Sequence, residues 1–153
     1  MVNLPIVFSD KKVTSFGGMS LMKRFIDQTD IRDCLSKLNL PLPKSNAGYN
    51  PVHIIEAFWL SIWTGASRYI HCDWLRYDTV LKDIFGWNRL PSQSTYSCLF
   101  GKFSQKRNNE VFPSLQHWFF GLLGVDNLTI DFDSTVITRY GEQQGSAKGY
   151  KSK

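Results

Sequence analysis

Two aspartates stand two residues apart near the end of the chain, in a segment rich in β-branched residues. Asp131 and Asp133 belong to residues 128–138, where apolar and polar residues alternate. A period of two predicts a β-strand, so both carboxylates project from one face, about 7 Å apart along the strand. Hard divalent cations favour such oxygen ligands. The alternative is that these aspartates face solvent or cap a turn with Ser134 and Thr135.

A second polar group starts a helix predicted in the middle of the chain. Gln93, Ser94 and Thr95 follow Ser92, and Ser92 or Ser94 is suited to cap that helix. In a helix-turn-helix, the first residues of the second helix contact base edges of DNA. The connection from Gly86 to Ser92 is longer than the usual three or four residues, so a plain helix hairpin with a solvated polar end is the alternative.

Basic side chains follow the same helix. Lys102, Lys106 and Arg107 are suited to contact DNA phosphates, or they form an ordinary solvated helix end. The whole chain has 18 Lys and Arg against 13 Asp and Glu, a formal net charge of +5. This modest excess permits nucleic-acid binding without requiring it.

The elements that position these residues are predicted to be mostly helices. Asn50 followed by Pro51 is a typical helix start, and apolar residues then recur up to Gly65. Residues 6–8 form a short strand or extended arm. Further helices are expected at about residues 19–26, 31–38, 70–77, 79–85, 93–103 and 109–123. The five tryptophans are expected to pack in the core rather than to form a binding surface.

Composition narrows the protein class. A chain of 153 residues with 42% hydrophobic residues buries one core, and no apolar stretch reaches the length that spans a membrane. No secretory signal is recognisable, so a cytoplasmic location is expected. Cys34, Cys72 and Cys98 are odd in number and far apart, which favours reduced, buried thiols over disulfides or a zinc site. Phosphate-loop, dinucleotide-binding and common hydrolase motifs are missing from the sequence.

Several short blocks occur in order along nearly the whole chain. They are residues 6–10, 13–18, 40–49, 90–95, 130–136, 140–141 and 145–150. Together these blocks resemble the DDE transposases of bacterial insertion sequences, in the group typified by insertion sequence 1380. Their combination is far more specific than any single block.

The resemblance implies a fold and a chemistry. In this family a mostly helical N-terminal region helps to bind the terminal inverted repeats of double-stranded DNA. A ribonuclease-H-like domain then performs phosphoryl transfer with two Mg²⁺ or Mn²⁺ ions, held by two Asp and one Glu. By residue match the first catalytic and metal-binding Asp is Asp133, at the end of the first strand, and Asp131 is a supporting acidic ligand.

The sequence departs from the family pattern at its end. In relatives the chain continues past Gly149-Tyr150 into the rest of the catalytic domain, whereas this sequence ends at Lys153. The resemblance therefore covers only the first third of such an enzyme, without the second Asp and the Glu. We expect an N-terminal fragment that is catalytically inactive alone and binds no metal tightly.

The expected architecture is mainly α. Residues 1–125 form the helical DNA-binding region, and residues 126–153 begin a truncated ribonuclease-H-like domain whose first β-strand lacks its sheet. The expected partners are double-stranded DNA with terminal inverted repeats, and an intact transposase copy or a second copy of this chain. The expected setting is the bacterial cytoplasm, associated with the nucleoid. The alternatives are a degenerate remnant and a helical DNA-binding regulator without transposase activity.

Overall fold

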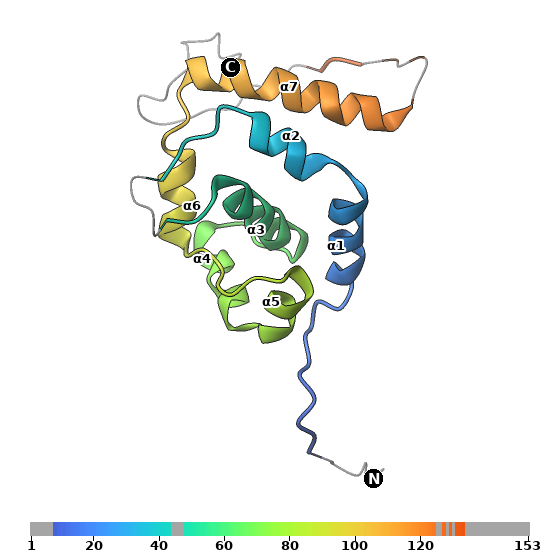
Figure 1. The fold of residues 1–153 in the computed structure, drawn as a ribbon, viewed down its shortest axis with the longest axis vertical. Coiled ribbons are helices and arrows are strands. Elements are labelled where there is room, and N and C mark those ends of the chain that lie inside the picture. The colour runs from blue at the N-terminus through green and yellow to red at the C-terminus, as the bar shows by residue number, and fades with distance from the viewer. Residues whose placement is uncertain (1–7, 44–47, 125–126, 128, 130, 134–153) are drawn as a thin grey trace, which may run out of the picture. The chain divides into compact units, whose positions relative to one another are not determined.

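The computed structural model describes residues 8–43, 48–124, 127, 129 and 131–133. These residues form helices joined by loops, without a strand among them (Figure 1). The prediction of a mainly helical chain is confirmed. The elements are α1 (Met19–Gln28), α2 (Ile31–Lys37), α3 (Pro51–Trp63), α4 (Tyr69–Cys72), the 3-10 helix η1 (Trp74–Tyr77), α5 (Thr79–Phe85), α6 (Gln93–Phe100) and α7 (Gln105–Leu123).

The chain divides into two compact units, residues 1–102 and 103–153. The first unit contains α1 to α6, and the second contains α7. The division predicted at residues 125 and 126 on grounds of function stays a prediction. In the part of the chain that the structure describes, no helix is long and apolar enough to cross a membrane.

Helix α3 is the centre of the first unit. It begins as the sequence predicts, because the Asn50 side chain accepts a hydrogen bond from the Val52 N–H at 2.8 Å and Pro51 occupies the first turn. Ala57 and Leu60 of α3 are completely buried. Helices α2, α4 and α6 pack against α3, while α5 packs against α1. The core therefore surrounds α3, as its apolar circumference predicts.

The helix predicted over residues 70–77 is divided in two. Helix α4 ends at Cys72, and η1 begins at Trp74. At the junction the Asp73 N–H donates to the Ile70 carbonyl and the Arg76 N–H donates to the Asp73 carbonyl, both with the three-residue spacing of a 3-10 helix. The chain therefore tightens at Asp73.

Two other helix ends show what the sequence does and does not specify. Helix α5 ends at Gly86, whose φ of 69° is left-handed and favours glycine, as predicted. Helix α7 begins at Gln105, earlier than the predicted residue 109, because the Ser104 hydroxyl accepts a hydrogen bond from the Arg107 N–H at 3.3 Å. A serine cap was therefore missed there.

The core is mainly aliphatic. The prediction that all five tryptophans pack in the core is wrong for Trp74. Trp74 is 67% exposed, whereas Trp59, Trp63 and Trp87 are half-buried. Tyr96 is the largest fully buried side chain.

The three cysteines are free, as predicted, but they differ in burial. Cys72 is buried, Cys34 is intermediate and Cys98 is exposed. The prediction of a buried thiol is therefore wrong for Cys98. Cys98 lies on the outward side of α6, one turn after Ser94.

The predicted terminal strands have little support in the described residues. Thr129 and Asp131–Asp133 have no regular secondary structure, and residues 128, 130 and 134–138 of the same expected strand lie outside the described residues. Of the expected N-terminal strand or arm, residues 6 and 7 also lie outside them, and Phe8 is not in a strand. The ribonuclease-H-like strand therefore stays a prediction.

Candidate nucleic-acid interface

The first turn of α6 carries the residues predicted to read DNA. Gln93 and Ser94 are exposed, and Thr95 is half-buried. Ser92 occupies the cap position, but its hydroxyl lies 2.8 Å from the Ser94 hydroxyl and 3.2 Å from the Thr95 hydroxyl instead of capping the backbone. The helix start is held by Asp73, whose Oδ1 accepts the Gln93 N–H at 3.0 Å. A carboxylate from the α4–η1 junction thus replaces the predicted serine cap.

Buried side chains fix the orientation of α6. Tyr96 and Leu99 are buried, and the Tyr96 ring lies 5.6 Å from the Phe58 ring of α3. Burial raises the pKa of Tyr96, so its hydroxyl stays neutral. Because α6 packs on α3 and α4 and not mainly on α5, helices α5 and α6 do not form the compact pair of a helix-turn-helix. The outward side of α6 presents Gln93 and Ser94 to solvent.

A groove runs along α6. Its volume is about 580 Å³, and its lining includes Ser94, Thr95 and Lys102 on the α6 side and Pro41 and Tyr49 opposite. The Lys102 ammonium donates to the Leu42 carbonyl at 3.1 Å. The structure therefore brings together Ser94, Thr95 and Lys102, three of the predicted DNA-binding residues.

Lys106 and Arg107 belong to the first turn of α7. Lys106 is exposed and Arg107 is half-buried. Both lie in the second unit, apart from the unit that contains α6. Their contact with the same DNA phosphates as Lys102 stays a prediction.

A basic and aromatic group of exposed residues next to α6 was not predicted from the sequence. It consists of Arg68, Trp74, Arg76 and Tyr77 in and around α4 and η1, and we call it the α4–η1 surface. Tyr77 is 84% exposed. Helices α4 and α6 pack together, so this surface and the start of α6 are neighbours. The signal in the sequence is the recurrence of Arg and aromatic residues over 68–77.

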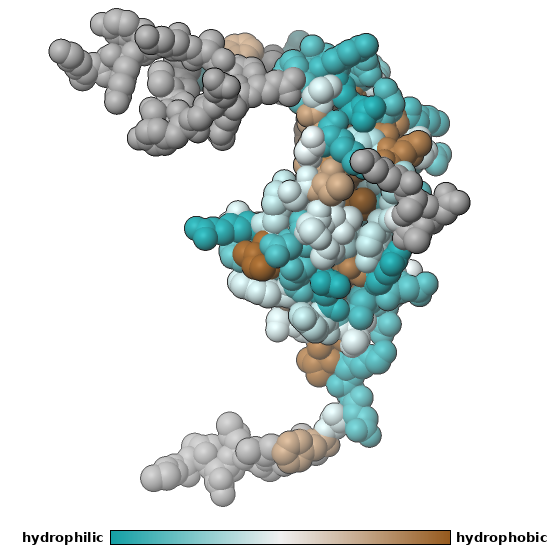
Figure 2. Space-filling model, turned by 90° about the vertical axis from the view of Figure 1, so that its left-hand side faces the viewer, coloured by the Kyte–Doolittle hydropathy of each residue, from teal (hydrophilic) through white to brown (hydrophobic). Residues whose placement is uncertain are grey.

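Figure 2 views the side of the molecule that carries α4 and α6. Pale residues, which are neither strongly hydrophilic nor strongly hydrophobic, gather in the middle of this view, with hydrophilic and a few hydrophobic residues around them. A pocket of about 420 Å³ opens beside α4 and is lined by residues that include Phe58, Ser67 and Arg68. Aromatic and small polar groups with a few arginines are the composition of surfaces that bind bases.

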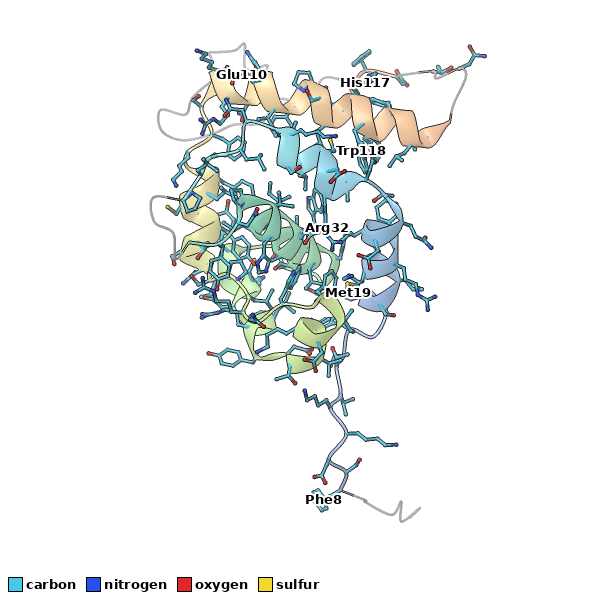
Figure 3. All side chains as sticks on the ribbon, in the orientation of Figure 1. Phe8, Met19, Arg32, Glu110, His117 and Trp118 are labelled. Atoms are coloured by element: carbon cyan, nitrogen blue, oxygen red, sulfur yellow. The ribbon has the colours of Figure 1, made fainter. Side chains whose placement is uncertain are left out.

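Several charged residues serve the fold instead. Arg32 extends from α2 to α3, where its Nε donates to the Glu56 carboxylate (Figure 3). The same guanidinium contacts Asp27 at 2.7 Å, and Asp27 contacts Lys23 at 2.5 Å. Burial raises the pKa of Glu56 although Arg32 opposes this, whereas hydrogen bonds from Lys23 and Arg32 lower the pKa of Asp27. This network joins α1, α2 and α3.

A ring cluster lies where the α5–α6 connection meets the start of α3. The His53 ring is 5.5 Å from Tyr49 and 4.8 Å from Trp87, and the Arg89 guanidinium lies 4.2 Å from the centre of the Tyr49 ring. The Nε2 atom of His53 is buried and has no hydrogen-bond partner among the residues that the structure describes. Burial, with a smaller effect of Arg89, lowers the pKa of His53.

The roles predicted for Asp131 and Asp133 in catalysis and metal binding stay predictions. Asp131 and Asp133 are both exposed. Among the described residues there is no group of three His, Cys, Asp or Glu side chains that could hold a metal ion.

The family model described as transposase DDE domain, group 1, matches residues 2–153. The chain therefore belongs to this DDE transposase family, whose members generally use divalent metal ions. No curated protein and no solved structure matches the chain. The closer relation to the group typified by insertion sequence 1380 stays a prediction.

Proposed function

We propose that the helical unit of this chain binds DNA for a transposase and recognises the terminal inverted repeats of its element. Membership of the family supports DNA as the partner. The structural observation that carries the proposal is the exposed first turn of α6, held by Asp73 and bordered by the groove that Lys102 lines.

The chemistry of that turn suits base recognition. The Gln93 amide has one donor and one acceptor side, which match the major-groove edge of adenine. The Ser94 hydroxyl both donates and accepts, so it pairs with several base edges. Lys102 supplies a positive charge on the border of the groove and is suited to a phosphate.

Two substitutions separate base recognition from phosphate contact. Gln93→Ala should reduce the preference for an inverted-repeat duplex over a scrambled duplex by about fivefold or more. Lys102→Met should weaken binding to both duplexes equally. It should also lower the slope of log affinity against log salt concentration by about one, because about one counterion fewer is released. Fluorescence anisotropy with labelled duplexes measures both effects. Equal losses on both duplexes for Gln93→Ala would contradict the role of α6 in recognition.

We also propose that the 153-residue chain alone does not cleave or join DNA. The resemblance assigns only Asp133, with Asp131 beside it, to the catalytic carboxylates among these residues. A strand-cleavage assay with Mg²⁺ or Mn²⁺ on inverted-repeat DNA should show no product above the buffer control. Cleavage that disappears in Asp133→Ala would overturn this proposal.

A further inference from the structure

Trp74 is an exposed aromatic side chain in a fixed position. One face of its ring rests on the His71 imidazole, with ring centres 4.5 Å apart and planes inclined by 19°. His71 is held in turn by Ser67, whose N–H donates to Nδ1 at 3.2 Å. Trp74 nevertheless keeps 67% of its surface exposed, so the opposite face of its ring is open to solvent.

Two exposed arginines, one before and one after Trp74 in the sequence, supply positive charge near this ring. Arg68 precedes α4, is exposed, and forms no ion pair with any described residue. Arg76, in η1, lies 3.6 Å from Asp73, and its side chain is 45% exposed. So long and exposed an ion pair is weak, which leaves the guanidinium able to contact a phosphate.

We propose that Trp74 stacks on an unpaired base of the bound DNA, while Arg68 and Arg76 contact the flanking phosphates. This inference rests on the proposed function. It specifies that the α4–η1 surface binds an unpaired part of the DNA. An exposed aromatic ring holds single-stranded nucleic acid, or a base turned out of a duplex, by stacking, and nearby cationic side chains bind the backbone. A paired base offers only its edge in a groove, whereas an unpaired base offers the whole face that an open indole ring matches.

The pocket beside α4 offers space for a nucleotide that is turned out of the duplex. Ser67 and Arg68 line that pocket, and Ser67 also holds the His71 ring under Trp74. The pocket therefore adjoins the side chains that support Trp74. Its aromatic wall, Phe58, is suited to a flat, weakly polar group.

The test compares the full chain with Trp74→Ala, Trp74→Phe and, as a control, Phe25→Ala at a half-exposed position of α1. The probes are an inverted-repeat duplex, the same duplex with one unpaired base placed at successive positions, its single strand, and a scrambled duplex. For at least one position, the unpaired base should tighten binding of the unchanged chain about tenfold. Trp74→Ala should remove about tenfold of that affinity, Trp74→Phe less than about threefold, and Phe25→Ala none.

Tryptophan fluorescence provides a readout that a purely structural role would not change. Quenching by the unpaired-base duplex should occur in the unchanged chain and be lost in Trp74→Phe, which keeps most of its affinity. This second measurement also decides the matter if Trp74→Ala fails to fold, which circular dichroism would show.

Three results of the binding and quenching measurements would overturn the inference. They are equal binding of the paired and unpaired duplexes by the unchanged chain, equal loss on both duplexes in Trp74→Ala, and quenching that persists in Trp74→Phe. Dependence of self-association, but not of DNA binding, on Trp74 would also overturn it, because the surface would then be a protein contact. Failure of the proposed function is recognised separately, since the unchanged chain would then bind inverted-repeat and scrambled duplexes equally.

Discussion

Glu56 illustrates how single residues determine the stability of the first unit. Its side chain is 5% exposed, and Arg32 contacts it as a cation. A buried carboxylate that loses its cationic partner is strongly destabilising, because its charge is no longer compensated. The pair therefore fixes α2 on α3 even though its net contribution to stability is small.

We expect Arg32→Met to lower the free energy of unfolding by about 2 kcal/mol at pH 7, less than for a fully buried pair because Arg32 is partly exposed. The loss should shrink as the pH falls through the raised pKa of Glu56, because a protonated carboxyl needs no cation. Urea unfolding at several pH values measures both effects. Arg24→Met, at an exposed position of α1, is the control and should cost less than about 0.5 kcal/mol. Equal losses in the two variants would contradict the role of the pair.

His53 makes a pH-dependent contribution of the opposite sign. Burial lowers its pKa, so its contribution is complete above the ordinary value of 6.5 and is lost as the pH falls through the lowered pKa. His53→Phe keeps a ring beside Trp87 and should make the free energy of unfolding less dependent on pH between about pH 7 and 5. His117→Gln, at an exposed position of α7, is the matched histidine control. An unchanged slope in His53→Phe would show that His53 does not titrate during unfolding.

At the scale of elements, Asp73 joins the α4–η1 junction to the start of α6. Its carboxylate accepts the Gln93 N–H, so the orientation of the first turn of α6 depends on a residue twenty positions earlier in the chain. This contact links the two parts of the candidate DNA interface. The proposed base recognition by Gln93 and the proposed stacking by Trp74 therefore both depend on the hydrogen bond between Asp73 and Gln93.

Asp73→Ala should therefore lower the free energy of unfolding by about 1 kcal/mol and reduce the preference for inverted-repeat DNA. The matched control is Asp83→Ala in α5. It removes the same charge, from an exposed ion pair that Asp83 forms with Lys12. Both variants should bind scrambled DNA slightly more tightly, because each loses one negative charge. Thermal unfolding and anisotropy give the two values. Equal sequence preference in the two variants would show that Asp73 acts only through its charge.

The helices were largely predictable from local signals, and the site was predictable only in part. Asn50-Pro51 and Gly86 specify their helix ends by backbone chemistry alone, which a sequence reveals directly. The exposed position of Trp74 was not predictable, because large aromatic residues usually pack inside and only tertiary contacts decide. The Asp73 cap was missed for the same reason, since its partner belongs to a distant helix.

At the scale of the whole molecule, the net charge of +5 alone would give weak binding to any DNA. Recognition requires the helical unit to place a few side chains against particular bases, which adds affinity for one sequence only. Association with an intact transposase or with a second copy of this chain stays a prediction.

The most direct test of a DNA-recognising transposase unit is a salt titration of binding by the unchanged chain. An inverted-repeat duplex from a related element is compared with a scrambled duplex of equal length. We expect affinity for both to fall steeply with salt, and the inverted repeat to be preferred by at least about tenfold throughout. Equal, weak binding to both duplexes would contradict the account, because charge alone would then explain the interaction.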